Sequence, residues 1–313
     1  MKLLKNYFLP LFIVFAFAAC DSDDNNDIIE PPITEYNLTK LEVTFADQVK
    51  RPLFDLTYDD NNKLTQAVYY FYNIGEEDGD ETDVKLDETM TYHFIHSADI
   101  ISVNCIRINH TKDDAKSEWI TTLTTSNGRI VKASNVNNKG KTIVYTWENN
   151  KLKKVFNYDF TYNGSNVEKA IEAHEYSDDY YIRENTCSYA LTCNTNKTNP
   201  FAYIPLELLA VMDSDGDNMD ILPLVLSANE VQQVVHNDEA KMKKSPDNNV
   251  EWESMVKETI NYTYTRDNNN LVTTATTQQT DYFSLTHHVD SQWNVEETTD
   301  GGSTLMHFTY VER

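Results

Sequence analysis

A two-residue alternation, broken at clusters of Asn and Asp, is the feature that most restricts how this chain can fold. From Tyr36 onward, Thr, Tyr, Val and Ile alternate with polar residues. Such a period places apolar and polar side chains on opposite faces, which predicts half-buried antiparallel strands. One unit recurs five times: an alternating strand, an Asn/Asp/Gly turn and the start of a second strand, over residues 54–64, 123–130, 145–152, 160–167 and 262–271. Because Asn, Asp and Gly tolerate the positive φ of tight turns, each unit predicts a hairpin, and the series predicts a meander.

These hairpin units carry a resemblance to known families. They resemble the YD-type repeat of bacterial surface proteins, whose tyrosine-aspartate pair occurs in full at Tyr58-Asp59. Together with the segment 199–205, Asn-Pro-Phe-Ala-Tyr-Ile-Pro, the units make residues 36–313 look still more like a family of Bacteroidetes lipoproteins of unknown function with a porin-like domain. This resemblance implies a single mostly β domain, a long antiparallel meander curved into a partial or open barrel. The likeness to porins is one of shape, because the strands lack a continuous apolar band that could face lipid.

Residues 199–235 interrupt the alternation. Two apolar runs, 206–212 and 222–226, are flanked by Pro and Asn, which predicts a short helical or loop insertion. We expect this insertion to plug or cap the concave side of the sheet. A central pair of core strands is the alternative.

The N-terminus reads as an export signal. Residues 1–19 combine Lys2 and Lys5 with a short apolar run, which predicts a cleaved signal peptide. The residues Phe17-Ala18-Ala19-Cys20 resemble the lipobox of bacterial lipoproteins, with Phe where Leu is usual, which implies lipidation of Cys20. An ordinary secretory signal followed by a chance cysteine is the alternative.

An acidic stretch follows the cysteine. The carboxylates of residues 20–35 repel one another, which predicts a solvated, disordered tether. The beginning of the stretch resembles the signal that directs Bacteroidetes lipoproteins to the outer face of the outer membrane, and consists of Asp21, Ser22, Asp23 and Asp24. A plain spacer is the alternative.

Charge and glycine content exclude several functions. The chain has 26 Lys+Arg against 50 Asp+Glu, a net charge of −24, so binding to nucleic acid or other polyanions is disfavoured. Phosphate-binding glycine loops and a GxSxG nucleophile motif do not occur in the sequence. We therefore expect a non-enzymatic protein that contacts the membrane only through its lipid anchor.

Three groups of residues are candidates for metal binding or a disulfide. Alternate carboxylates predict a calcium loop at Asp213, Asp215, Asp217 and Asp220, with a solvated acidic turn as the alternative and no other cofactor expected. The pairs His93/His96 and His287/His288 are disfavoured as metal sites, because neighbours three apart on a strand point to opposite faces and neither pair has an HExxH motif. Cys187 and Cys193 could form a disulfide, or could be free thiols like Cys105.

Aromatic residues are the remaining candidates for binding. Tyr and Trp on an exposed sheet face form stacking surfaces for sugar rings or anchors for proteins. The residues selected on this basis are Trp147, Trp252, Trp293, Tyr70 and Tyr72; the alternative is that these rings fill the core. Alternation requires that two of residues 69–72 face outward.

Taken together, the sequence predicts a lipid-anchored cell-surface protein that binds a ligand, with a glycan as the expected class. A protein-interaction or structural subunit of an outer-membrane complex, which would use exposed strand edges, is the alternative. A secreted-type hydrolase is the third class.

Overall fold

The computed structural model describes residues 36–45, 47–77, 80–136, 140–177, 181–212, 221–244, 249–289 and 292–312. The strands are β1 (Tyr36–Thr44), β2 (Lys50–Tyr58), β3 (Leu64–Glu77), β4 (Asp80–His96), β5 (Ile100–Asn109), β6 (Ala115–Ser126), β7 (Arg129–Val136), β8 (Lys141–Glu148), β9 (Lys151–Val155), β10 (Tyr158–Asn163), β11 (Asn166–Ser177), β12 (Tyr181–Thr198), β13 (Asn229–Lys244), β14 (Asn249–Arg266), β15 (Val272–Val289) and β16 (Gln292–Glu312). Three short helices lie between β12 and β13: η1 (Pro200–Ala202), α1 (Leu206–Met212) and α2 (Leu222–Leu226).

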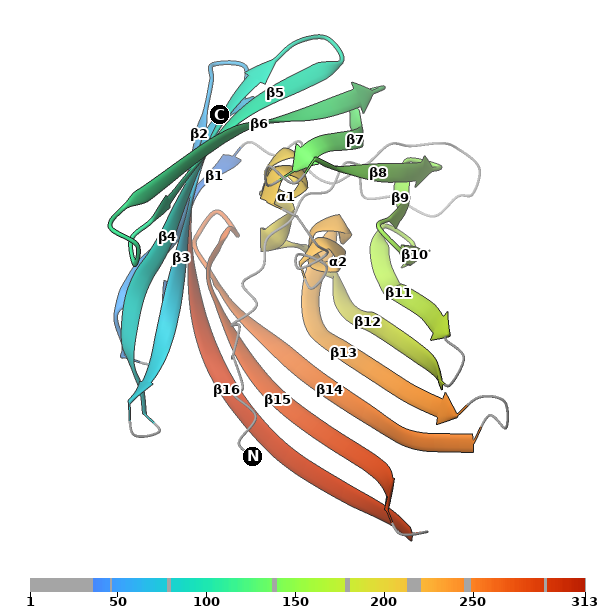
Figure 1. The fold of residues 1–313 in the computed structure, drawn as a ribbon. Helices are drawn as coiled ribbons and strands as arrows, with labels where there is room; N and C mark the ends of the chain where they lie inside the picture. The colour runs from blue at the N-terminus through green and yellow to red at the C-terminus, as the bar shows by residue number, and fades with distance from the viewer. Residues whose placement is uncertain are drawn as a thin grey trace.

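The strands form an antiparallel meander that closes into a 16-stranded barrel (Figure 1). Each strand pairs with its neighbours in sequence, and β1 closes the barrel by pairing with β16 from Tyr36↔Glu312 to Thr44↔Leu305. The predicted antiparallel meander is confirmed. The prediction of a partial or open barrel is wrong, because hydrogen bonds between the first and last strands join the two edges of the sheet.

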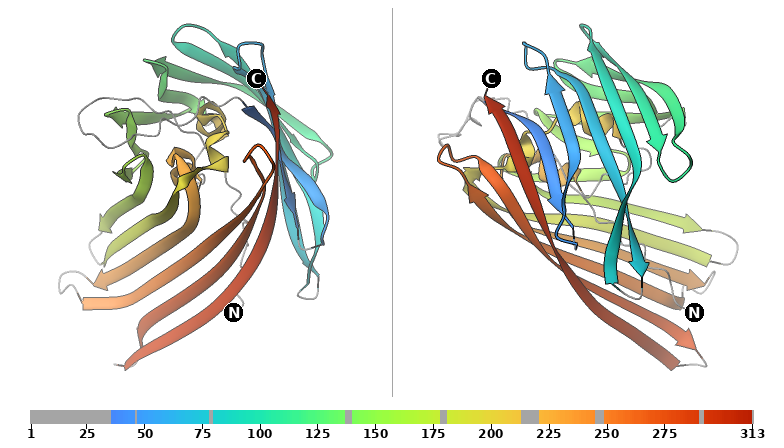
Figure 2. Two further views of the ribbon diagram at one scale, coloured as in Figure 1. Left: turned by 180° about the vertical axis from the view of Figure 1, so that it is seen from behind. Right: turned by 90° about the vertical axis from the view of Figure 1, so that its left-hand side faces the viewer.

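Closure extends over only part of the barrel's height. β1 pairs with residues 305–312 of β16, so within the described strands residues 292–304 of β16 pair with β15 alone. In the same way, residues 172–177 of β11 pair with β12 alone, since β10 reaches only to residue 171. Beyond the helices, β11–β16 therefore continue as a curved sheet (Figures 1 and 2).

The predicted hairpin units are confirmed at the β2–β3, β6–β7, β8–β9, β10–β11 and β14–β15 connections. Their turns contain residues in the left-handed region, namely Asn62, Asn127, Gly128, Asn149, Asn150, Gly164 and Asn270. This conformation is available to Asn and Gly at low cost, so the turn residues themselves set the positions of the hairpins.

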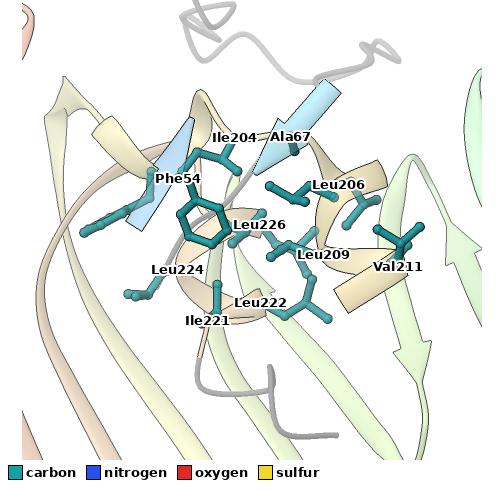
Figure 3. Packing of buried hydrophobic residues seen from close by; sticks show 14 of the residues in the cluster. Phe54, Ala67, Ile204, Leu206, Leu209, Val211, Ile221, Leu222, Leu224 and Leu226 are labelled. Atoms are coloured by element: carbon teal, nitrogen blue, oxygen red, sulfur yellow. The ribbon is translucent and has the colours of Figure 1, made fainter. Parts of the chain in front are cut away.

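The insertion between β12 and β13 lies inside the barrel wall and builds its core (Figure 1). Leu206, Leu209, Leu222, Leu224 and Leu226 pack together with residues from the wall such as Phe54 and Ala67 (Figure 3). The prediction of a short helical insertion that plugs the barrel is confirmed, whereas its limit at residue 235 is wrong, because β13 begins at Asn229.

Buried hydrogen bonds fix the described part of this insertion, residues 199–212 and 221–228, which we call the plug. Asn199 is fully buried, and its side-chain amide donates to the carbonyl oxygens of Leu224 at 2.6 Å and Ser227 at 2.8 Å. Its side-chain oxygen accepts from the backbone N–H of Phe201 at 3.1 Å. One side chain thus joins η1 to the end of α2 and satisfies polar groups that would otherwise be buried without partners.

The outer surface of the long strands is hydrophilic. On β13 the core side chain Val234 alternates with outward residues that include Asn237, Glu239 and Lys241, and on β14 Ile260 alternates with Lys257 and Glu253. This polarity is opposite to that of a membrane-spanning barrel, in which the apolar side chains face outward. In the part of the chain that the structure describes, no helix is long and apolar enough to cross a membrane.

Candidate functional site

The inner face of β11–β15, beyond the plug, gathers polar side chains in rows that run across the strands. Directly paired residues share a face of the sheet. Val234 and Ile260 are paired and buried in the core, so their side chains face inward. Because side chains alternate along a strand, the residues two positions before and after each of them face inward as well. The next row toward the free ends of the strands comprises Tyr189, His236, Glu258, Asp281 and Asp300.

Within these rows, five side chains form what we call the inner-face cluster: Cys187, His236, Glu258, Gln279 and Asp281. The Cys187 Sγ lies 3.3 Å from the His236 Nε2, and the His236 Nδ1 lies 3.4 Å from the Glu258 Oε2. The Gln279 amide donates to the Glu258 Oε1 at 2.6 Å and to both carboxylate oxygens of Asp281 at 3.0 and 3.1 Å. Four adjacent strands, β12 to β15, therefore contribute to one continuous polar network.

Two tyrosines, Tyr158 on β10 and Tyr189 on β12, contact the cluster. The Tyr189 ring stacks on the His236 imidazole at a centroid distance of 4.4 Å and an interplanar angle of 4°. The Tyr158 hydroxyl hydrogen-bonds with Cys187 and Glu172, and burial followed by these contacts raises the pKa of Tyr158 above its ordinary value. The hydroxyl is therefore protonated at neutral pH and provides a hydrogen-bond donor next to the sulfur.

A second row lies close to the free ends of the same strands and contains Tyr176, Arg183, Met242 and Trp252, which we call the mouth row. The Arg183 guanidinium sits over the Trp252 ring at 5.9 Å from its centroid, and Tyr176 is 66% exposed. Aromatic faces beside a fixed cation and amide groups are the surfaces on which planar or ring-shaped ligands stack.

The other predicted aromatic residues lie elsewhere. Trp147 on β8 is half-buried against the core, and its indole Nε1 donates to the Ile130 carbonyl oxygen at 2.7 Å. The side chain of Trp293 is outside the described residues. The structure thus brings Trp252, but not Trp147, to the inner face that carries the cluster.

Tyr70 and Tyr72 share one face of β3, while Tyr69 lies on the other face and stacks on the core residue Phe54 at 5.0 Å. The Tyr70 hydroxyl donates to the Asp55 carboxylate at 2.9 Å, and burial together with this contact raises the pKa of Tyr70 to about 12. The Tyr72 ring packs against Phe45 at 5.2 Å. These half-buried tyrosines lie on strands far along the sheet from the inner-face cluster.

Several sequence predictions fall outside the described residues. They are the signal peptide of residues 1–19, lipidation at Cys20, the export signal at Asp21, Ser22, Asp23 and Asp24, and the calcium loop at Asp213, Asp215, Asp217 and Asp220. In the ranges that the structure covers, no three His, Cys, Asp or Glu side chains are placed to hold a metal ion.

His93 and His96 lie on β4 with opposite orientations, as alternation requires. His96 has the same parity as the buried residues Tyr92 and Phe94, and its Nε2 lies 2.7 Å from the Leu64 carbonyl oxygen. His93 has the parity of Ile95, which is exposed. The expectation that they do not share a site follows from this geometry.

Cys105, Cys187 and Cys193 are free thiols. Cys187 and Cys193 both lie on β12, and six residues of extended strand separate their backbones by roughly 20 Å. A disulfide needs Cα atoms within about 7 Å. Of the two alternatives, the free thiols are therefore correct, and the disulfide is excluded.

Sequence reasoning missed the inner-face cluster. From the sequence, Cys187 is a candidate only for a disulfide or a free thiol, and His236, Glu258 and Gln279 are not candidates for any site. The positions are separated by about 20 to 50 residues along the chain and come together only through the register of β12 to β15. The alternation of each predicted strand could have identified them. On each strand these residues lie on the same face as the apolar residues that pack in the core nearer the plug.

No family model matches the chain, and no curated protein matches it. Among solved structures, a porin-like protein from Bacteroides uniformis is similar at 14% identity and a TM-score of 0.43, over 88% of this chain and 98% of that chain. A porin-like protein from Bacteroides vulgatus is similar at 10% identity and a TM-score of 0.27, with the same coverage of 88% and 98%. The barrel described above rests on its own strand pairing.

Proposed function

We propose that this protein binds a glycan on the inner face of β11–β15, at the surface of a bacterial outer membrane to which a lipid on Cys20 tethers it. The observation that carries the proposal is the combination, on one concave sheet face, of the mouth row with the hydrogen-bonding side chains of the inner-face cluster. Ligand sites in proteins combine aromatic surface with a few fixed polar groups in this way.

The chemistry of the two groups suits a sugar. The apolar face of a pyranose ring stacks on indole or phenol rings, and its hydroxyls pair with carboxylates and amides. Trp252 supplies the ring for one sugar of an oligosaccharide, whereas Glu258, Gln279 and Asp281, roughly 20 Å farther along the strands, supply acceptors and donors for another and already orient one another.

The tether and the surface location are supported by the N-terminal sequence and by the hydrophilic outer surface. A barrel with charged side chains on its outer face is expected to be surrounded by water and not by lipid. A lipidated cysteine followed by an acidic spacer would hold it next to the membrane. Protease added to intact cells tests the location. The protein should be cut together with a known surface lipoprotein, and its survival while that control is cut would refute surface exposure.

Titration of the purified protein with a polysaccharide panel tests binding, followed by tryptophan fluorescence and calorimetric heat, with and without Ca²⁺. We expect saturable binding that Trp252→Ala abolishes. Trp147→Ala is the matched control, because it removes an indole that packs against the core and should leave affinity unchanged. Equal loss in both variants, or no heat with any glycan, would refute glycan binding at this face.

A protein-interaction subunit is the second candidate function. The observation that favours it is the edge of β16, whose residues 292–304 pair only with β15 among the described strands. Such an edge can add a strand from a partner, although Glu296, Glu297 and Asp300 on it disfavour self-pairing. Crosslinking in intact envelopes through residues on this edge would identify a partner, and the absence of crosslinked species would set this candidate aside.

A further inference from the structure

Cys187, His236 and Glu258 stand in series on three adjacent strands, β12, β13 and β14. Sulfur to imidazole is 3.3 Å and imidazole to carboxylate is 3.4 Å. All three are partly accessible: the Cys187 residue is of intermediate exposure, and the side chains of His236 and Glu258 are 19% and 15% exposed. This is the arrangement of an activated nucleophile, which can occur on any fold. The nucleophile lies close to a base, and the base lies close to a third group that orients it.

The contact with Glu258 determines which nitrogen of His236 acts. A carboxylate oxygen only accepts, so the pair favours the tautomer with the proton on Nδ1. The lone pair is then on Nε2, which faces the Cys187 thiol. Gln279 holds Glu258 from its other oxygen, and Tyr189 holds the imidazole plane, so the base is oriented from both sides.

Among the described residues, carboxylates lie beside the sulfur on the same face of the sheet. Glu172 on β11 and Asp238 on β13 are paired with Cys187 in the register, and Glu258 and Asp281 lie farther along the same face. The His236 Nε2 lies 3.3 Å from the sulfur, and the Tyr158 hydroxyl supplies a donor there. Among these groups His236 is the base that can accept the thiol proton, and the experiment tests this role.

We propose that Cys187 is the nucleophile of an acyl-transfer site whose substrates are esters. His236 takes the thiol proton as the sulfur attacks the ester carbonyl carbon. The carbon–oxygen bond to the alcohol breaks, the proton goes from His236 to the departing alkoxide, and the acyl group remains on sulfur as a thioester. Water, deprotonated by His236, then attacks the thioester, which releases the carboxylic acid and restores the thiol. No electron is transferred in any step.

A dithiol redox role fits the structure less well. Disulfide exchange within one chain needs a second thiol close to the first. Cys193 is displaced by about 20 Å along the strand, and Cys105 lies on β5 across the barrel. Acyl transfer needs only the groups that already touch Cys187. The proposal goes beyond glycan binding and would replace the expectation of a non-enzymatic protein.

The experiment treats the purified protein with p-nitrophenyl acetate, follows p-nitrophenolate release and maps the acetyl group by peptide mass. We expect one acetyl group, on Cys187, and none in Cys187→Ser. His236→Gln should slow acylation about 100-fold or more, the range for loss of a general base. Glu258→Gln should slow it in the same direction. Cys193→Ser is the matched control and should acylate at the wild-type rate, because burial raises the pKa of that thiol to about 11.

Iodoacetamide alkylation of the wild-type protein at neutral pH provides a readout that does not depend on the folding of any variant. Cys187 should react faster than Cys193 and Cys105, because His236 can accept its proton, whereas burial raises the pKa of the other two thiols to about 11. Equal alkylation of the three thiols would overturn the proposal. Trp252→Ala separates it from the proposed function, since this variant should lose glycan binding and keep acetylation of Cys187.

Discussion

Replacing Phe201 by Ala tests whether the plug is part of the barrel's cooperative core. Phe201 is fully buried in η1 and makes edge contacts with Tyr262 at 5.8 Å and Phe308 at 5.7 Å, on β14 and β16. Truncation of a buried Phe costs about 3–5 kcal/mol through lost transfer energy and the remaining cavity. Because two ring pairs worth about 0.5–1.5 kcal/mol each are lost as well, we expect the upper end of that range.

The assay is urea unfolding of the purified variant, followed by far-ultraviolet circular dichroism and by tryptophan fluorescence. A single transition at lower urea with an unchanged slope is expected in both signals. Ile120→Ala is the matched control, since this side chain is 57% exposed on β6 and its loss should change stability by less than about 0.5 kcal/mol. A loss below about 1 kcal/mol for Phe201→Ala, or two separated transitions, would show that the barrel wall folds without the plug.

Three further predictions concern other parts of the fold. Asn199→Ala leaves the carbonyl oxygens of Leu224 and Ser227 without the buried amide, and should cost about 2–4 kcal/mol in urea unfolding; a neutral result would contradict the role of Asn199 as a link within the plug. Glu230→Gln removes the charge that pairs with the largely buried Arg266 and should cost about 3 kcal/mol, which Arg266→Met in the same background should partly recover. Burial raises the pKa of Glu207 above its ordinary value of 4.5, which means that the folded protein favours the protonated, neutral carboxyl. The folded state is therefore most stable at low pH, where this carboxyl is neutral, and loses that stability as pH rises through the folded-state pKa. Glu207→Gln should therefore be more stable than the wild type at pH 7, with the difference shrinking toward pH 4, and a variant that is less stable at pH 7 would contradict this sign.

Local chemistry made much of the fold predictable. The alternation on residues such as Tyr262 and Tyr264, and the Asn-rich turn that ends at Asn270, place both a strand and its reversal within a few residues. The apolar runs of the plug could be recognised in the same way, because Leu206 and its neighbours have no polar face to present to water. Where the plug ends was not predictable to the residue, since Asn229 fits a loop as well as a strand.

Closure of the barrel could not be predicted, because nothing in the sequence of β1 requires it to meet β16. That pairing joins residues about 270 positions apart, such as Leu41 and Phe308, and depends on the summed curvature of all the strands between them. The same holds for the free cysteines, whose separation follows from both lying on one extended strand.

The sequence by itself determined the β meander, its turns and the presence of an apolar insertion, because each depends on contacts and backbone preferences within a few residues. Only the tertiary structure decided which side chains meet. Cys187, His236 and Glu258 were three unconnected residues along the chain and became a series through the register of β12, β13 and β14. A one-residue shift in either pairing would have turned one of them to the outer face. The site therefore exists because of how the strands align, an interaction between distant segments that no single segment encodes.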